Sequence, residues 1–247
     1  MPALFFCSIV SAMRLDQAVA ARHPEISRRK ARELISERRV LVNDRPVGAA
    51  SREVADSDRI TIIETVPEIA VLRETEEWVA VNKPSGVPTQ PPRDRSHRSL
   101  EELLRVQYRS LFVVHRIDTG TSGVVVFAKT RDAAARLSEL FASRTIRKTY
   151  LAVISGVIDA EIAIDTPVDG KDALTVIRPL RGSLVEADLH TGRTHQIRVH
   201  LSSIGHPVLG DRRYGGPSAP RLMLHAWRIA HESFGVIEAP PDAAFES

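Results

Sequence analysis

The chain has 247 residues, of which 43% are hydrophobic, and its formal net charge at pH 7 is +3. This length suits one large domain, or one medium domain with a small appendage, and the apolar fraction excludes a disordered chain. No apolar run reaches the roughly 18–20 residues that a membrane-spanning helix needs. The single Cys7 excludes a disulfide framework and a cysteine-ligated zinc site, and it fits a cytoplasmic location.

An apolar stretch over residues 3–13 comes first. It contains Ser8 and Ser11 and lacks a basic start, so we do not expect a signal peptide. Whether Met1 or Met13 is the true start stays open, and no role for the stretch follows from its residues.

Basic residues are concentrated near the N-terminus. Between Arg14 and Arg45, nine Lys/Arg and five acids give a net charge of +4, which exceeds that of the whole chain. Arginine is the main source of positive charge, and its planar guanidinium pairs with phosphate through two hydrogen bonds and stacks on bases. A GC-rich genome would also enrich arginine, but the clustering favours a basic face on this segment.

The first folded unit is predicted over residues 13–63. A short helix over 14–22 is followed by Ser27, whose hydroxyl can cap a second helix over 28–39. The pattern of two basic helices, two short strands and the sequence RRVLVNDRPV resembles the RNA-binding domain first named from small-subunit ribosomal protein four. This resemblance implies that RNA is bound by Arg28, Arg29, Lys30, Arg32, Arg38 and Arg39. The alternative is a helical cap whose charged face is only solvated.

After a linker at 64–68, a larger unit is predicted over residues 69–238. Strands are expected at 78–81, 111–114, 124–128, 150–154 and 185–189, and helices at 100–108, 132–143 and 194–204. Strands joined both by hairpins and by helices favour an α+β fold with a mixed, mostly antiparallel central sheet and flanking helices. Loop 84–98 is rich in proline and basic residues, and it either closes over RNA or is simply solvated.

Two polar clusters in this unit are candidates for chemistry. HRIDTGTSG, residues 115–123, places Asp118 just beyond a buried strand, where an aspartate often only caps a turn. GRTHQIRVH, residues 192–200, places Arg198 about 100° from Ile197 around a helix, at the flank of its buried stripe. We expect Arg198 to pair with Asp118 and keep it ionised, as a nucleophile requires.

Other site chemistries fit these residues poorly. His195 and His200 are five residues apart, which does not place both imidazoles on one helical face for a metal. The sequence has neither of the glycine-rich patterns GxGxxG and GxxxxGK[ST] that bind nucleotide phosphates. Ser122 lacks the Gly-x-Ser-x-Gly elbow of a serine nucleophile. We therefore expect no metal and no nucleotide cofactor.

Ordered motifs over about residues 70–230 resemble the RluA family of pseudouridine synthases. HRIDTGTSG is similar to the family pattern His-Arg-Leu-Asp-x-x-Thr-Ser-Gly, with Ile117 in place of leucine. The other matching motifs are NKPSGVPTQ (82–90), Lys148-Thr149-Tyr150, GRTHQIRVHLSSIGHPVLGDRRYGG (192–216) and Leu224-His225-Ala226. The pair Thr119-Gly120 departs from the charged residue that family members often carry there, which puts the grip on the RNA strand in doubt.

The resemblance implies a role for each matching residue. Asp118 would attack the target uridine, Arg198 would pair with Asp118, and Tyr150 would stack on the flipped base and help take the proton lost from its carbon five. These three are the predicted catalytic residues. Predicted substrate-binding residues are Arg116, which would help extrude the base, Leu224, which would pack against it, and Thr121. Flipping a base costs a few kcal/mol, of which an aromatic face returns roughly 1–3 kcal/mol.

The sequence thus predicts a monomeric isomerase that forms pseudouridine in structured RNA without cofactor or metal. Large-subunit ribosomal RNA is the first expected target and transfer RNA the second. Two alternatives stay open: a catalytically silent RNA-binding or ribosome-assembly protein of the same fold, and a hydrolase that cleaves a nucleoside bond with Asp118.

Overall fold

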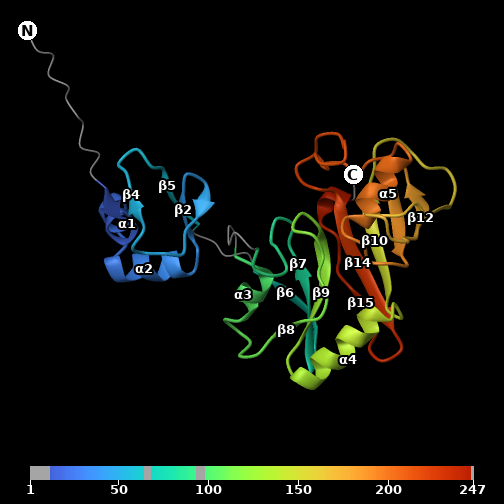
Figure 1. Ribbon diagram of the computed structural model, residues 1–247, viewed down its shortest axis with the longest axis horizontal. Helices are drawn as coiled ribbons and strands as arrows, with labels where there is room; N and C mark the ends of the chain where they lie inside the picture. The colour runs from blue at the N-terminus through green and yellow to red at the C-terminus, as the bar shows by residue number, and fades with distance from the viewer. Residues whose placement is uncertain (1–11, 64–67, 93–97, 246–247) are drawn as a thin grey trace, which may run out of the picture. The chain divides into compact units, whose positions relative to one another are not determined.

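The structure is a computed structural model that describes residues 12–63, 68–92 and 98–245. The chain divides into two compact units, residues 1–67 with 91–98 and residues 68–90 with 99–247 (Figure 1). Most of the apolar stretch 3–13, most of the predicted linker 64–68 and part of loop 84–98 lie outside the described residues. The predicted domain limits, 13–63 and 69–238, stay predictions. Among the described helices, none is long and apolar enough to cross a membrane.

The N-terminal unit packs two helices against short strands. Its elements are β1 (Met13–Arg14), α1 (Leu15–Arg22), α2 (Arg28–Ser36), β2 (Val40–Val42), β3 (Arg45–Pro46), β4 (Glu53–Val54) and β5 (Ile60–Ile62). Apolar residues at helical spacing, including Ala31, Leu34 and Ile35, form its buried core. The Ser27 hydroxyl accepts from the Lys30 amide and caps α2 as predicted.

The predicted end of α2 is wrong. The helix stops at Ser36 rather than at residue 39. Arg38 adopts a left-handed conformation with φ of 57°, which a helix cannot continue through. The chain turns there and enters β2.

The larger unit is built on a ten-stranded sheet of order β11-β12-β13-β10-β14-β9-β7-β6, with β15 paired to β14 and β8 to β9. Its strands are β6 (Ala70–Glu74), β7 (Trp78–Lys83), β8 (Phe112–Val113), β9 (Ser122–Ala128), β10 (Arg147–Val153), β11 (Ile162–Ile164), β12 (Thr175–Arg181), β13 (Leu184–Leu189), β14 (Leu224–His231) and β15 (Gly235–Glu238). In the described chain β9 and β14 run parallel, whereas the other pairs are antiparallel. The sheet is therefore mixed and mostly antiparallel, as predicted.

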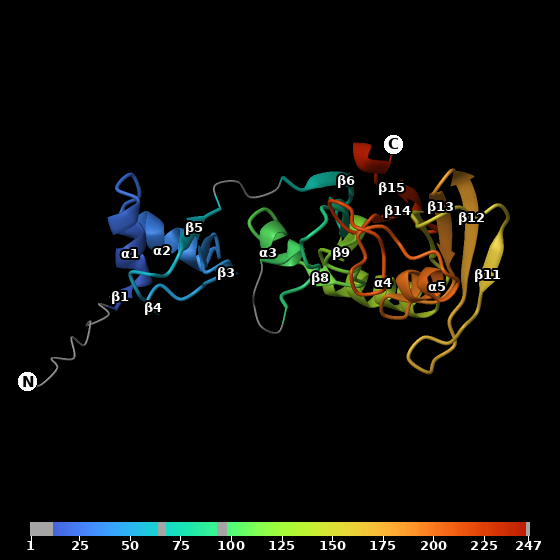
Figure 2. The same cartoon turned by 90° about the horizontal axis from the view of Figure 1, so that it is seen from above.

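The helices of the larger unit pack beside different strands of the sheet. They are α3 (Leu100–Leu104), α4 (Arg131–Ala142) and α5 (Gln196–Ser203), with a short 3₁₀ turn at Ala243–Phe245. Figure 1 shows α3 beside β6–β8 and α5 beside β12, and Figure 2 shows α4 and α5 from above. Ser99 and Glu102 form a capping box at the start of α3. The predicted helix 194–204 begins two residues later, because His195 is left-handed, with φ of 57°.

Gly123 lets the two central strands approach each other. It pairs with Ala226 across the parallel β9–β14 contact. A Cβ at this position would lie 2.2 Å from the Ala226 carbonyl oxygen, and the φ of Gly123 is 116°. Only glycine fits such a position. The loop before β9 and the start of β14 are thereby held together, and both contribute to the site described next.

Candidate active site

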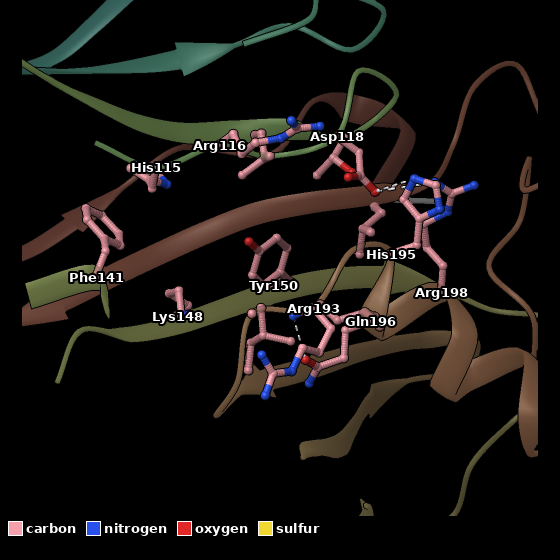
Figure 3. A pocket seen from close by; sticks show the side chains of 16 residues that line it. His115, Arg116, Asp118, Phe141, Lys148, Tyr150, Arg193, His195, Gln196 and Arg198 are labelled. Atoms are coloured by element: carbon pink, nitrogen blue, oxygen red, sulfur yellow. Dashed lines mark hydrogen bonds and ion pairs between the residues drawn. The ribbon is translucent and has the colours of Figure 1, made fainter. Parts of the chain in front are cut away.

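A cavity of about 250 Å³ lies where the central strands meet α5. The residues predicted around the substrate all line it: Arg116, Asp118, Thr121, Tyr150, Arg198 and Leu224. Figure 3 shows Asp118 and Arg198 together at one end, the Tyr150 ring in the middle, and His115, Phe141 and Lys148 at the other end. The fold therefore collects side chains from four distant motifs into one pocket.

Asp118 lies in the loop between β8 and β9. Its backbone carbonyl accepts a hydrogen bond of 3.1 Å from the amide of Thr121, which closes a turn. Its carboxylate Oδ2 is 3.3 Å from Nη1 of Arg198 and 3.7 Å from Nε2 of His195. The carboxylate is partly exposed to the cavity, so it can reach a bound molecule while a cation holds it.

Arg198 has a second and closer acid partner, Asp211. Its Nε and Nη2 donate to the two Asp211 oxygens at 2.6 and 2.8 Å. Burial opposes the charge of Arg198, but Asp211 and Asp118 outweigh this and raise the pKa of its guanidinium. The Asp211 carboxylate is 1% exposed. The two-pronged pair fixes the plane of the guanidinium, which leaves Nη1 directed at Asp118.

His195 and Tyr214 complete this end of the cavity. Nδ1 of His195 lies 2.9 Å from the Tyr214 hydroxyl, and the Tyr214 ring lies under the Arg198 guanidinium, 5.0 Å from centroid to Cζ. Desolvation lowers the pKa of His195, against the attraction of Asp118. The imidazole is thus held beside the carboxylate by the same loop that supplies Asp211.

Tyr150 forms the middle of the cavity wall. It lies on β10 where the register with β14 shifts between Thr149 and Leu151, and such irregularities re-aim side chains beside active sites. Burial, together with the charge of Asp118, raises the pKa of the Tyr150 phenol well above its usual value. The ring is therefore a neutral phenol at physiological pH, which suits stacking better than it suits removal of a proton.

The far end of the cavity combines an imidazole with a lysine. His115 stacks on Phe141 with ring centroids 4.0 Å apart, and its Nε2 accepts a hydrogen bond of 2.9 Å from the amide of Val126. Burial, reinforced by Lys148, lowers the pKa of His115 to about 3. His115 is therefore neutral and shapes the wall.

Lys83 supports the Asp118 loop from beneath. Its side chain is completely buried, and Nζ donates to the carbonyls of Pro84, Val87 and Thr119 at 3.0, 2.7 and 3.2 Å. Thr119 follows Asp118 directly. Burial lowers the pKa of Lys83 to about 7, although the charge of Asp118 acts in the opposite direction. This lysine is a positioning residue for the loop.

A Lys83→Met substitution is expected to lower the free energy of unfolding by about 2 kcal/mol at pH 7. Three carbonyls lose their donor, and this loss outweighs the gain from removing a buried cation. The unfolded chain holds the Lys83 proton up to about pH 10.5, whereas the folded chain releases it near pH 7. The unfolded state therefore binds more protons in this window, and the stability of the wild type relative to the variant should rise with pH. Denaturant unfolding from pH 7 to 10 measures both effects. Lys171→Met, at an exposed lysine, is the control, and an equal loss in both variants would contradict the role of Lys83.

In the N-terminal unit, three arginines surround one buried carboxylate, that of Asp16. The carboxylate of Asp16 is 0% exposed and accepts from Nε of Arg14, Arg28 and Arg32 at 3.1, 3.1 and 2.8 Å. Burial would raise the pKa of Asp16, but the hydrogen bonds from Arg32, Arg14 and Arg28 outweigh it and hold that pKa far below its usual value. Within the described chain, the terminal guanidinium nitrogens of these arginines have no other acceptor. They are free to bind an anion.

The other predicted RNA-binding residues lie in varied settings. Arg29 is exposed, and Lys30 forms an ion pair of 2.7 Å with Glu33. Nε of Arg39 donates to the Ile63 carbonyl at 2.9 Å, and its Nη1 lies 3.5 Å from the Glu37 carboxylate. Arg38 is half-buried at the left-handed turn after α2. The six residues thus do not form a single uniform surface.

Several site residues escaped the sequence prediction: Lys83, Lys148, His195, Asp211 and Tyr214. All of them fall inside the quoted motifs, but their spacing in the sequence does not indicate which loops contact each other in the folded chain. In the described part of the chain, no group of three or more histidine, cysteine, aspartate or glutamate side chains is placed to hold a metal ion.

Comparison with known proteins agrees with this geometry. The family model described as RNA pseudouridylate synthase matches residues 77–203, and the S4 domain model matches residues 13–60. An uncharacterized RNA pseudouridine synthase of Aquifex aeolicus is 33% identical over 85% of this chain and 80% of its own length. The ribosomal large subunit pseudouridine synthase D of Nitrosomonas europaea is 31% identical over 89% of this chain and 77% of its own length.

A solved structure shares the fold of the larger unit. The human RNA pseudouridylate synthase domain containing 1 aligns with a TM-score of 0.61 and 27% identity, and covers 71% of this chain and 84% of that chain. The motifs, the mixed sheet and the relatives agree with one another. The chain therefore belongs to the RNA pseudouridylate synthase family, in its RluA branch with an N-terminal S4 domain, and is an isomerase that acts on RNA.

Proposed function

We propose that this enzyme converts uridine to pseudouridine in large-subunit ribosomal RNA, with Asp118 as the nucleophile. The observation that carries the proposal is the carboxylate of Asp118, open to a nucleotide-sized cavity and 3.3 Å from the guanidinium of Arg198. A carboxylate held by a cation stays charged and can attack carbon without first losing a proton. The relative from Nitrosomonas europaea, which is named for the large ribosomal subunit, supports the choice of RNA.

The reaction needs rearrangement of one nucleoside and no external reagent. Asp118 attacks the sugar anomeric carbon or ring carbon six, the bond from nitrogen one to the sugar breaks, and the uracil turns. A bond then forms from carbon five to the sugar, and the bond between Asp118 and the substrate breaks, which regenerates the carboxylate. Carbon five loses its proton, and nitrogen one gains one. The product has the same atoms as the substrate, which is why neither metal nor cofactor is required.

The cavity walls suit a base that has left its stack. Tyr150 offers an aromatic face, and Leu224, at 3% exposure, offers an apolar one. Arg116 is exposed at the cavity rim two residues before Asp118, where a cation can take the place of the extruded base. Aromatic stacking and a replacing cation together offset the cost of flipping.

Pseudouridine mapping of total RNA from cells with and without the gene tests this proposal. We expect one or a few pseudouridines in large-subunit ribosomal RNA to disappear, and to return when purified enzyme is incubated with the unmodified RNA. Loss confined to transfer RNA would move the target to the second predicted RNA. An unchanged map, or release of free uracil in the incubation, would contradict the isomerase activity on these RNAs and favour the silent or hydrolytic alternative.

The arginines on Asp16 are expected to supply sequence-independent RNA affinity. Replacing Arg28 and Arg32 by glutamine should weaken RNA binding about tenfold or more. It should also reduce the slope of log affinity against log salt by about one and a half, because two fewer phosphate contacts release counterions. Filter binding of ribosomal RNA fragments between 50 and 200 mM salt, roughly the range where such contacts dominate, measures both.

A charge-matched control comes from the same unit. Arg45 on β3 and Arg59, directly before β5, are exposed and lie outside the predicted RNA-binding set. Their double replacement by glutamine removes the same charge but should leave the salt slope within error of the wild type. Equal slopes in all three proteins would show that the Asp16 arginines are merely solvated.

A further inference from the structure

Lys148 contributes an ammonium group to the wall of the cavity. It lies on β10 two residues before Tyr150 and lines the same cavity as Asp118. It is half-buried, and within the described residues its side chain has no hydrogen bond or ion pair. Burial lowers the pKa of Lys148, and the positive charge of Arg144 acts in the same direction. A partly buried ammonium with a second cation nearby is unfavourable until an anion joins them.

Arg144 is the second cation of this pair. It follows the end of α4, is exposed, and has φ of 62°. In the described part of the chain it too has no acid partner, although acids pair with arginines elsewhere in this unit. Because no described acid neutralises Arg144 or Lys148, both side chains can pair with an external anion.

A second cavity, of about 380 Å³, begins beside this pair. Arg144 lines it together with Ile146, Arg147 and Leu189, and Leu189 also lines the cavity of Asp118. The two cavities are therefore neighbours along β10, with Lys148 on one and Arg144 on the other. Figure 3 shows Lys148 at the end of the first cavity opposite Arg198.

Among the described residues, Arg144 is the one arginine lining the second cavity that has no acid partner. Arg147 and Arg178 share the buried Asp188 at 2.7 and 2.6 Å, and Arg178 also pairs with Glu161 and Glu186. Ile146 and Leu189 add apolar surface. Positive charge at the rim with apolar walls suits a nucleotide, whose phosphate is anionic and whose base has two flat faces.

We propose that Lys148 and Arg144 bind the phosphodiester between the target uridine and a neighbouring nucleotide, and that the second cavity receives this neighbour. The inference rests on the proposed function, since it assumes that the first cavity holds the target uridine. The chain of RNA would then pass from Asp118 past Tyr150 and leave between Lys148 and Arg144.

The test uses target RNA in which one linkage flanking the uridine, on the 5′ or the 3′ side, is an uncharged methylphosphonate. The wild-type enzyme should bind one of these two RNAs about tenfold more weakly than unmodified RNA, the loss expected for one charge-assisted contact. Lys148→Met and Arg144→Gln should each weaken binding of unmodified RNA about tenfold as well. Replacing the same linkage by the neutral one should then weaken RNA binding by these variants only a little further. Arg131→Gln, at an exposed arginine ten residues from Phe141 and so about 15 Å along α4 from it, is the matched control.

The proposal would be overturned if the substitution and the neutral linkage each weakened RNA binding and their effects multiplied when combined. Full wild-type affinity for both RNAs with a neutral linkage would also overturn it. Arg144 is exposed, so its variant stays informative should Lys148→Met not fold. If the wild type binds these RNAs but forms no pseudouridine at the chosen uridine, the proposed function has failed. If pseudouridine forms but the substitution and the neutral linkage weaken binding independently, only the phosphodiester site has failed.

Discussion

An Asp118→Asn variant is expected to form pseudouridine at least about a thousandfold more slowly than the wild type in a single-turnover assay, because the amide oxygen is a poor nucleophile in place of a carboxylate. Asparagine has nearly the same shape and can still accept the hydrogen bond that Arg198 donates at 3.3 Å. Fold and RNA affinity should therefore stay close to those of the wild type. The loss belongs to the chemical step, so raising the RNA concentration should not restore it.

Two controls separate chemistry from charge. Asp159→Asn, at an exposed acid outside the cavity, changes the net charge equally and should keep the full rate. Circular dichroism and RNA binding of Asp118→Asn show whether the protein is folded and loaded. A rate above one tenth of the wild type in a folded, RNA-bound Asp118→Asn protein would remove Asp118 from the chemistry.

Local patterns in the sequence predicted most elements of the fold. Residues such as Ser27 and the pair Ser99 and Glu102 cap their helices by contacts within three residues, and such contacts are visible in sequence order. Short strands were harder to find. β6 exposes most of its side chains and β11 has three residues, so neither shows a sustained apolar alternation. Edge strands of this kind are held by pairing with a neighbour rather than by burial of their own residues.

The site likewise contains residues that the local sequence indicated and residues that only the tertiary structure brings together. The sequence placed a carboxylate after a buried strand and an arginine on the flank of a helix, and this predicted that Asp118 and Arg198 would meet. It did not indicate Asp211, because the loop from Val208 to Gly216 folds back on α5 through tertiary contacts. Nor could spacing reveal that Lys148 has no acid partner among the described residues. The absence of a partner depends on every neighbour in space, and sequence order does not give that.

Asp211→Asn is expected to lower the free energy of unfolding by about 3–5 kcal/mol, since it leaves a guanidinium buried with a weaker partner. Arg198 is 11% exposed and Asp211 1%, at distances of 2.6 and 2.8 Å. Asparagine can still accept from the amides of Arg213 and Tyr214, which Asp211 binds at 3.2 and 3.3 Å. The loss therefore comes mainly from the ion pair. Chemical denaturation measures it, with Asp159→Asn as the exposed control.

The same variant should slow catalysis for a reason distinct from stability. Without Asp211 the guanidinium is free to turn and pair fully with Asp118, the acid 3.3 Å away, and a carboxylate occupied on both oxygens attacks carbon poorly. We expect kcat to fall about tenfold or more, with a smaller change in KM, at a temperature where the variant is folded. The double variant Arg198→Met with Asp211→Asn discriminates between the two effects. It removes the buried guanidinium that has lost its closest acid partner, so stability should recover relative to Asp211→Asn alone. Activity should stay low, because Asp118 has lost its cation. Recovery of both together would mean that Asp211 acts only on the fold.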